Sequence, residues 1–252
     1  MSSVFSTIKS QGITPKKSLG QNFLIDENIV RKIAKTANIK KTDVVVEIGP
    51  GTGVLTKELA LYAKKVIAIE KDEKLAKSLD IKNVKVITGD ALIKIRDIRG
   101  KYKVVANIPY YLTSFLIRTL LELENKPVDI VLLIQKEVAK RICSEENSLL
   151  SLSVKYYAKA EIIDYVSRNC FFPKPKVDSA IIKITLNKRK KNDSLFKLIK
   201  KGFSHPRKTL INNLKQEKIE EFLTNRELDL KIRPEKLDIK DWIDLHSFIQ
   251  RK

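Results

Sequence analysis

Two short stretches and two isolated carboxylates supply residue types that can bind a cofactor and act on a nucleobase. Each lies at or just past the end of a short β-branched run. The set comprises Gly49, Gly51 and Gly53 of EIGPGTG, Glu70 at the end of KVIAIE, Asp90 after VKVITG, and Asn107, Pro109 and Tyr110 of NIPYY. The carboxyl ends of parallel strands meet at one edge of a sheet, where such folds bind their ligands. We therefore expect these side chains to share one site.

The glycine spacing discriminates between classes of cofactor. A dinucleotide fingerprint requires GxGxxG/A, whereas here the third glycine falls one position early and Val54 occupies the expected slot. No GK[ST] follows, so the loop does not match a phosphate-binding P-loop. Three close glycines allow a compact ligand to approach the backbone, and the next helix N-terminus favours a carboxylate, which suits S-adenosylmethionine. NAD and a plain structural turn are the alternatives.

The two carboxylates extend this pattern toward an adenosine. Glu70 can accept hydrogen bonds from both hydroxyls of a ribose. Asp90 can accept one from an adenine amino group, and the adjacent N–H of Ala91 can donate to a ring nitrogen. The alternative is that both carboxylates cap the helices that follow them. Together with the glycine loop, they favour the adenosine interpretation.

Asn107 suggests what happens to the substrate. The exocyclic amine of a base is a poor nucleophile because its lone pair is delocalised into the ring. The Asn107 side-chain oxygen and the Ile108 carbonyl can accept its two N–H groups and hold the nitrogen toward tetrahedral geometry for methyl transfer. No strong base is required, because the methylated nitrogen is positively charged and loses its proton to water.

The two residues after Ile108 fit the same chemistry. Pro109 fixes its φ angle and stiffens the turn, and Tyr110 can stack on a base that has been pulled out of its helix. The structural alternative is a strand end closed by proline, with Tyr110 in the core.

Composition narrows the classes of partner. The chain has 252 residues, and 50 Lys+Arg against 30 Asp+Glu give a net charge of +20. This favours nucleic acid or an acidic membrane face, with compositional drift as the alternative. Two distant cysteines and two histidines indicate neither a disulfide framework nor a metal site. There is no apolar run of bilayer length and no secretory signal, so we expect a cytoplasmic protein without a membrane anchor.

The pattern of apolar residues predicts the strands and helices that position these side chains. VVVEIG, KVIAIE, VKVITGD, YKVVAN and DIVLLIQ alternate with helical stretches, which predicts a doubly wound, Rossmann-like α/β domain with a mostly parallel sheet. EIIDYVS and SAIIKITL follow closely and predict an antiparallel edge pair. After the basic run NKRKKND the patterns are helical only. We predict a first domain over residues 1–187, with a basic arm at 1–25, and a small helical domain over 188–252.

In order and spacing, EIGPGTG, Glu70, GDA and NIPYY resemble the ribosomal RNA adenine N6-dimethyltransferases, which are class I methyltransferases. KKSLGQNFL, QKEVAKRI, FFPKPKVDSAI, RKTLINNL and IRPEKL are similar to segments of the family's small-subunit enzymes. The resemblance covers nearly the whole chain. It implies transfer of methyl groups from S-adenosylmethionine to N6 of two adjacent adenosines in the 3'-terminal hairpin of small-subunit ribosomal RNA. Each adenosine is dimethylated, and the implied process is small-subunit biogenesis.

The resemblance also implies roles for individual residues. Cofactor contacts are implied for Gln21, Asn22, Leu24, Gly49, Gly51, Glu70, Asp90, Ala91 and Asn107. The FxPxPxVxS element implies that Phe171 stacks on the target adenine opposite Tyr110, whereas composition alone predicts a core residue there. The chain departs from the family in SEENSLLSLSV, which lacks a Tyr-Gly-Arg-like group, and in the single arginine before KTL.

Basic residues outside these motifs are candidates for holding RNA phosphates, with an ordinary solvated surface as the alternative. They are Lys16, Lys17, Lys188, Arg189, Arg207 and Lys208. The expected partner is small-subunit ribosomal RNA or a 30S-type particle, bound by a monomer. Three rival functions remain: a resistance methyltransferase acting on large-subunit RNA, a ribosome-assembly or transcription-associated binding factor without essential catalysis, and a small-molecule methyltransferase.

Overall fold

The computed structural model describes residues 13–205 and 207–250, and the chain divides into two compact units. The first unit comprises residues 1–140 and 158–186. None of the helices in the described ranges is long and apolar enough to cross a membrane.

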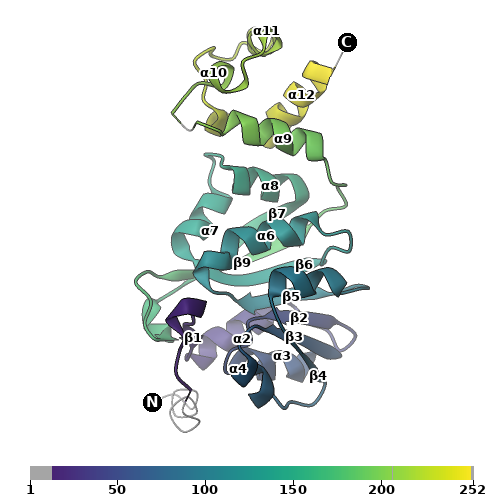
Figure 1. The fold of residues 1–252 in the computed structure, drawn as a ribbon, viewed down its shortest axis with the longest axis vertical. Helices are drawn as coiled ribbons and strands as arrows, with labels where there is room; N and C mark the ends of the chain where they lie inside the picture. Colours follow the sequence, from purple (N-terminus) through teal and green to yellow (C-terminus); the bar gives the residue numbers. More distant parts are fainter. Residues whose placement is uncertain (1–12, 206, 251–252) are drawn as a thin grey trace. The chain divides into compact units, whose positions relative to one another are not determined.

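A seven-stranded sheet forms the centre of the first unit, in the order β4-β3-β2-β5-β6-β9-β7. The strands are β2 (Val44–Ile48), β3 (Lys65–Glu70), β4 (Val84–Thr88), β5 (Lys103–Asn107), β6 (Asp129–Gln135), β7 (Ala158–Val166) and β9 (Ser179–Leu186). The first five pair in parallel, while β9 is antiparallel to both β6 and β7. The predicted mostly parallel sheet with an antiparallel edge pair is confirmed (Figure 1).

Helices cover both faces of this sheet. They are α2 (Glu27–Thr36), α3 (Val54–Tyr62), α4 (Glu73–Ser78), α5 (Ala91–Lys94), α6 (Thr113–Glu122) and α7 (Lys136–Cys143), with the short 3-10 turns η1 (Lys17–Leu19), η2 (Ile95–Asp97), η3 (Tyr110–Leu112) and η4 (Arg168–Cys170). In Figure 1, α6 lies in front of the sheet and α2 behind it. Asp26 caps α2, and Val30, Ile33 and Ala34 form its buried stripe.

The strand order determines where a ligand can bind. The chain runs outward from β2 through β3 to β4, then returns to place β5 on the other side of β2. The order therefore reverses between β2 and β5, and open α/β sheets bind ligands outside the carboxyl ends of their strands at such a switch point. The glycine loop follows β2, and NIPYY begins at the end of β5.

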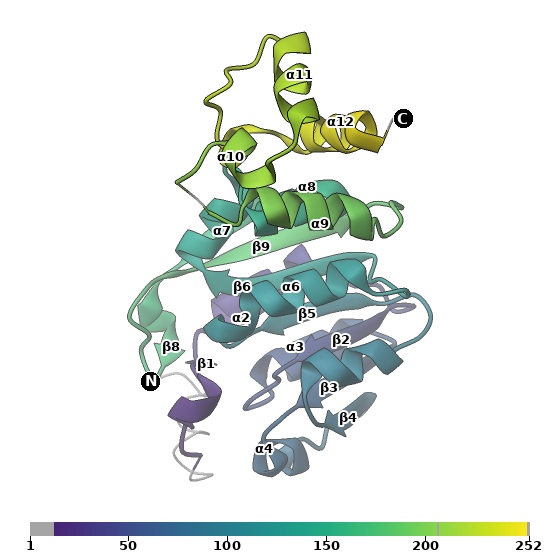
Figure 2. The same ribbon diagram turned by 45° about the horizontal axis from the view of Figure 1, so that its top comes forward.

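A separate two-stranded sheet joins segments far apart in the sequence. β1 (Phe23–Leu24) pairs antiparallel with β8 (Phe171–Phe172). The N–H of Ile25 extends the pairing by donating to the carbonyl of Cys170 at 2.8 Å. The QNFL segment and the FFPKPKV segment are thereby held side by side (Figure 2).

The second unit comprises residues 141–157 and 187–252. Its described helices are α8 (Leu149–Tyr157), α9 (Asp193–Gly202), α10 (Leu210–Leu214), α11 (Glu217–Asn225) and α12 (Ile239–Gln250), with η5 (Pro234–Lys236). The division predicted at residue 187 assigns α8 to the first domain, whereas this unit includes it. The reason is packing. The ring of Tyr157 stacks on Phe196 at 5.6 Å, and the Asn147 side chain donates to the carbonyl of Leu237 at 2.9 Å.

Asn213 organises the loop that carries two of the predicted basic residues. Its side chain is buried, and its oxygen accepts from the Ser204 hydroxyl at 3.2 Å and the His205 N–H at 3.1 Å. Its amide nitrogen donates to the carbonyls of His205 and Lys208 at 3.2 and 3.3 Å. One side chain thus replaces the regular backbone pairing that the loop lacks.

We predict that Asn213→Ala lowers the free energy of unfolding by about 2 kcal/mol, because the substitution removes the four hydrogen bonds of a buried side chain. Asn212→Ala is the matched control, since Asn212 is exposed on the same helix. Its effect should stay within about 0.5 kcal/mol. Denaturant titration of both variants measures the difference, and equal effects would contradict this role of Asn213.

Candidate cofactor and substrate site

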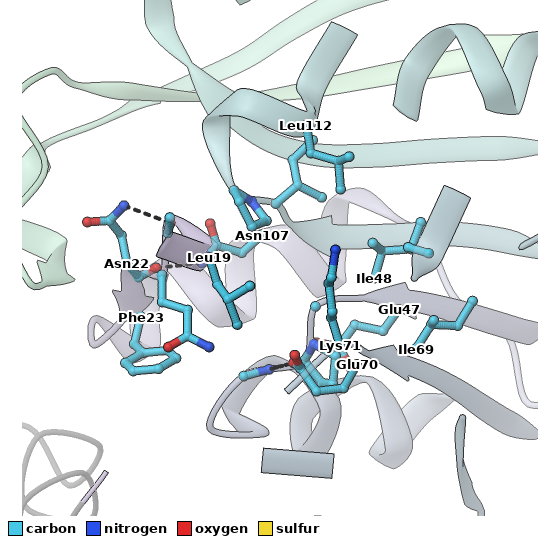
Figure 3. Close-up of a pocket in the computed structure, with 18 of the residues that line it drawn as sticks. Leu19, Asn22, Phe23, Glu47, Ile48, Ile69, Glu70, Lys71, Asn107 and Leu112 are labelled. Atoms are coloured by element: carbon cyan, nitrogen blue, oxygen red, sulfur yellow. Dashed lines mark hydrogen bonds between the residues drawn. The ribbon is translucent and has the colours of Figure 1, made fainter. Parts of the chain in front are cut away.

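A cavity of about 390 Å³ opens at the carboxyl edge of the sheet, within the range of small-molecule sites. Its lining includes most of the residues expected to bind the cofactor or to act in catalysis: Gln21, Asn22, Leu24, Gly49, Gly51, Glu70, Asp90, Ala91, Asn107, Pro109, Tyr110 and Phe171. Gly53, which was expected in the same site, is outside the lining and occupies the N-cap position of α3. Figure 3 shows side chains from the arm, the glycine-loop strand, β3 and β5 converging around it. The parallel strand ends bring together Glu70, Asp90 and Asn107, whereas the β1–β8 pair places the arm and Phe171 beside them.

Glu70 ties the glycine loop to the end of β3. Its carboxylate accepts from the N–H of Gly51 at 3.0 Å and from the N–H of Asp72 at 2.8 Å. Burial raises the pKa of Glu70 above its usual value, although these backbone donors oppose the rise. Glu70 is not the helix cap that was its alternative, because Asp72 caps α4. Each carboxylate oxygen still has a lone pair for a further donor.

Asp90 caps α5, which was the alternative to its interpretation as an adenine ligand. One carboxylate oxygen accepts from the N–H of Leu92 at 2.9 Å, and the other pairs with the Lys71 ammonium at 3.1 Å. The bond from Leu92 lowers the pKa of Asp90 below its usual value against the effect of burial, and Lys71 lowers it further. Capping and adenine recognition are compatible, since a carboxylate has about four acceptor positions.

The amide of Asn107 has a defined orientation. Its nitrogen donates to the backbone carbonyl of Asn22 at 3.2 Å, a contact labelled in Figure 3. A carbonyl can only accept, so the nitrogen must face Asn22, and the side-chain oxygen faces the other way as an acceptor. Asn22 in turn donates its own side-chain N–H to the carbonyl of Gly20 at 3.2 Å. The arm therefore sets the orientation of the residue expected to bind the target amine.

Tyr110 lies at the cavity wall and not in the core. Its ring is partly buried, and its hydroxyl is 2.8 Å from the hydroxyl of Ser179. Burial raises the pKa of Tyr110 above its usual value. The charge of Asp178 raises the pKa further, whereas the hydrogen bond with Ser179 lowers it. The turn that contains Tyr110 closes through a 3.0 Å hydrogen bond from the N–H of Leu112 to the carbonyl of Pro109.

The arm is bonded to the turn that follows Glu70. The Gln21 side chain accepts from the N–H of Lys16 at 2.7 Å and donates to Asp72 at 3.5 Å. The Lys16 ammonium also pairs with Asp72 at 2.7 Å. Despite burial, these contacts hold the pKa of Asp72 below its usual value. Gln21 and Lys16 therefore link the arm to the edge of the cavity.

Phe171 and Leu24 line the cavity from its hydrophobic side. Their side chains are 3% and 5% exposed and belong to the main core cluster, in register across the β1–β8 pair. Both descriptions of Phe171 thus apply: it is a core residue, and one face borders the cavity.

The six predicted RNA-binding residues are exposed but lie in different units. Lys16 and Lys17 belong to the first unit, where Lys16 is paired with Asp72. The others belong to the second unit, where the Arg189 guanidinium lies 5.0 Å from the centre of the Tyr156 ring. The structure brings none of these residues into the cavity lining.

Sequence analysis missed Glu47, a cavity residue whose side chain is almost fully buried. Within the described part of the chain, its Oε2 atom has no hydrogen-bond partner. Burial raises the pKa of Glu47 to about 8, and the nearby charge of Glu70 contributes to the rise. A signal was present, because Glu47 is the one acid in the otherwise apolar run VVVEIG.

The chain is similar to known proteins over nearly its whole length. The family model described as ribosomal RNA adenine dimethylase matches residues 12–251. Proteins named ribosomal RNA small subunit methyltransferase A include one from Streptococcus thermophilus, 41% identical over 97% of this chain and 95% of its own. Another, from Clostridioides difficile, is 38% identical over 94% of this chain and 91% of its own.

Two solved structures are similar over most of the chain. A dimethyladenosine transferase from Plasmodium falciparum has a TM-score of 0.74 and 29% identity, covering 87% of this chain and 94% of its own. The 23S rRNA methyltransferase ErmE has a TM-score of 0.73 and 26% identity, covering 91% of this chain and 100% of its own.

Glu47 predicts a pH dependence of stability. The unfolded chain releases this proton near the ordinary pKa of 4.5, whereas the folded protein keeps it until about pH 8. The free energy of unfolding should therefore fall as pH rises through this window, by up to about 1.4 kcal/mol per pH unit. Glu47→Gln should flatten the profile in denaturant titrations. Exposed Glu161→Gln is the control, and parallel profiles for wild type and Glu47→Gln would refute the assignment.

Proposed function

The chain belongs to the ribosomal RNA adenine dimethylase family, and we propose that it dimethylates N6 of two adjacent adenosines in the 3'-terminal hairpin of small-subunit ribosomal RNA. The methyl donor in this proposal is S-adenosylmethionine. The observation that carries it is the Asn107 amide, whose nitrogen is occupied by the Asn22 carbonyl so that its oxygen is the acceptor. We place the reaction in the cytoplasm, during small-subunit biogenesis.

The cavity suits this cofactor. S-adenosylmethionine supplies a methyl group activated by a positively charged sulfur, and it also carries an ammonium and a ribose. The cavity offers Glu70, with free lone pairs for the ribose hydroxyls, and the buried Glu47 with an unpartnered oxygen. The carboxylate of Glu70 favours a cationic ligand, and a bound cation would in turn favour the charged form of Glu47, whose pKa burial raises. Asp90 and Ala91 are assigned to adenine, and the loop of Gly49 and Gly51 to the methionine end.

The side chains around Asn107 hold the target base. The oxygen of Asn107 and the carbonyl of Ile108 accept the two N–H groups of the amine and set its geometry. Tyr110, held by Ser179, gives a ring of fixed position on which an extruded adenine stacks, with Phe171 opposite. Gln21, Asn22 and Leu24 of the arm close the cavity. The positively charged product nitrogen loses its proton to water, so the chain needs no histidine base.

Two observations favour the small subunit over the large. Proteins named for the small subunit are 36–41% identical to this chain over most of its length. ErmE, which acts on 23S RNA, is 26% identical. Fold alone does not discriminate, since the TM-scores of the two solved structures are nearly equal. We therefore propose small-subunit RNA, or a particle that contains it, as the partner of a monomeric enzyme.

The test uses radiolabelled S-adenosylmethionine with small and large subunits from cells that lack this enzyme. Mass spectrometry of RNA fragments then locates and counts the incorporated methyl groups. We expect two neighbouring adenosines near the 3' end of the small-subunit RNA, each dimethylated, and no label on large subunits. Label on large-subunit RNA alone would favour the resistance-type activity, and no label on either would overturn the proposal.

The same assay tests Asn107. Asn107→Ala should lower the transfer rate at saturating cofactor by about a hundredfold or more, because a preorganised acceptor at the reacting nitrogen is lost. Asn169→Ala is the matched control, since Asn169 is exposed and absent from the cavity lining. Full activity of Asn107→Ala would refute the mechanism.

A further inference from the structure

Two large aromatic side chains stand exposed at the rim of the cavity. Tyr111 is 57% exposed and Phe115 is 67% exposed, and both belong to the cavity lining. Single exposed apolar residues are ordinary on a protein surface, but two exposed aromatic side chains beside a functional cavity indicate a binding surface. The proposed roles of Asn107, Tyr110 and Phe171 do not use them.

The scaffold fixes the exposure of Tyr111. The residue lies in η3, directly after the NIPY turn, and its ring packs over Gly20 of the arm. A Cβ atom at position 20 would lie 3.1 Å from the Tyr111 ring and 3.4 Å from Pro109. Gly20 also has a φ of 60°, a conformation that favours glycine. The arm therefore packs against one side of the Tyr111 ring through Gly20, and the rest of the ring is exposed to solvent.

The exposure of Phe115 follows from the face of the helix on which it lies. In α6, the residues Leu116, Ile117 and Leu120 are buried and hold the helix to the unit. Phe115 lies in the first turn on the opposite side, and Tyr111 lies in the η3 turn that leads directly into this helix. Both side chains are exposed and line the cavity. The two aromatic residues are thus offered together at the cavity mouth.

The chemistry around the rim favours a nucleotide as occupant. Lys71, whose ammonium pairs with Asp90, also lines the cavity, and the whole chain carries a charge of +20. When one base enters the cavity, its neighbour in the strand remains at the mouth, and flanking nucleotides commonly determine substrate choice in enzymes that extrude a base. Unpaired bases stack on aromatic side chains, and every base has a π face to offer.

We propose that Tyr111 and Phe115 form a stacking platform for the base next to the adenine being methylated. The inference rests on the proposed function, in which that neighbour is itself an adenine, a purine with a large stacking face. Tyr110 differs from these residues, because its ring is partly buried and tied to Ser179 inside the cavity. The platform would hold the second adenine outside while the first is modified.

The first part of the test removes the rings from the full-length protein. Tyr111→Ala and Phe115→Ala should each lower kcat/KM for small subunits about tenfold, the lower part of the range for loss of base stacking. Phe115→Trp should keep activity, whereas Phe115→Leu should not, because leucine is apolar but has no π face. Calorimetry should give an unchanged S-adenosylmethionine affinity. Tyr62→Ala, which removes an exposed tyrosine outside the cavity lining, is the matched control.

The second part identifies the base. Small subunits are prepared in which the adenosine next to the measured target is kept or changed to uridine, and transfer to the remaining adenosine is followed. With wild type, the change should lower kcat/KM about tenfold; with Phe115→Ala, it should have little further effect, because the contact is already lost. If the uridine change lowers kcat/KM by the same factor in Phe115→Ala as in wild type, the two losses are independent and the proposal is overturned.

The remaining outcomes are also decisive. Wild-type activity of both alanine variants would overturn the platform and leave the proposed function intact. Activity retained by Phe115→Leu but lost by Phe115→Ala would indicate an apolar protein contact, such as a second copy of the chain, and would also overturn it. If wild type fails to label small subunits, the proposed function fails and the platform fails with it.

Discussion

The cavity depends on one buried carboxylate. Glu70 lies at the end of β3, and its two oxygens accept hydrogen bonds from the N–H groups of Gly51 and Asp72. Burial alone would favour the neutral acid, as it does for Glu47 one strand away. The backbone donors favour the charged form of Glu70 and give it a fixed position. These two hydrogen bonds connect the glycine loop, the end of β3 and the start of α4.

A second constraint is long-range. The β1–β8 pair joins the arm to the segment that carries Phe171, and the carbonyl of Asn22, just before β1, fixes the Asn107 amide. Residues from both ends of the first unit therefore determine the orientation of a side chain at the end of β5. The arm is part of the site in three ways: it orients Asn107, supports the Tyr111 ring through Gly20, and bonds to Asp72 through Gln21.

Sequence predicted the parts of the site that follow from local rules. The strands were visible as β-branched runs, and parallel pairing alone brings Glu70, Asp90 and Asn107 to one edge. Other features depend on contacts distant in sequence. No local pattern shows that α8 packs with the second unit, that Phe171 pairs with Leu24, or that the Glu47 carboxyl lacks a partner. The exposure of Phe115 depends on which face of α6 the sheet covers.

The most direct test of the account is the affinity of S-adenosylmethionine for Glu70→Gln, measured by titration calorimetry. The substitution keeps the size of the side chain but turns one acceptor into a donor, opposite either a backbone N–H or a ribose hydroxyl. We predict a loss of affinity of at least about tenfold, with exposed Glu73→Gln unchanged as the control. Unaltered binding by a folded Glu70→Gln variant would contradict the account of this cavity as a cofactor site organised by Glu70.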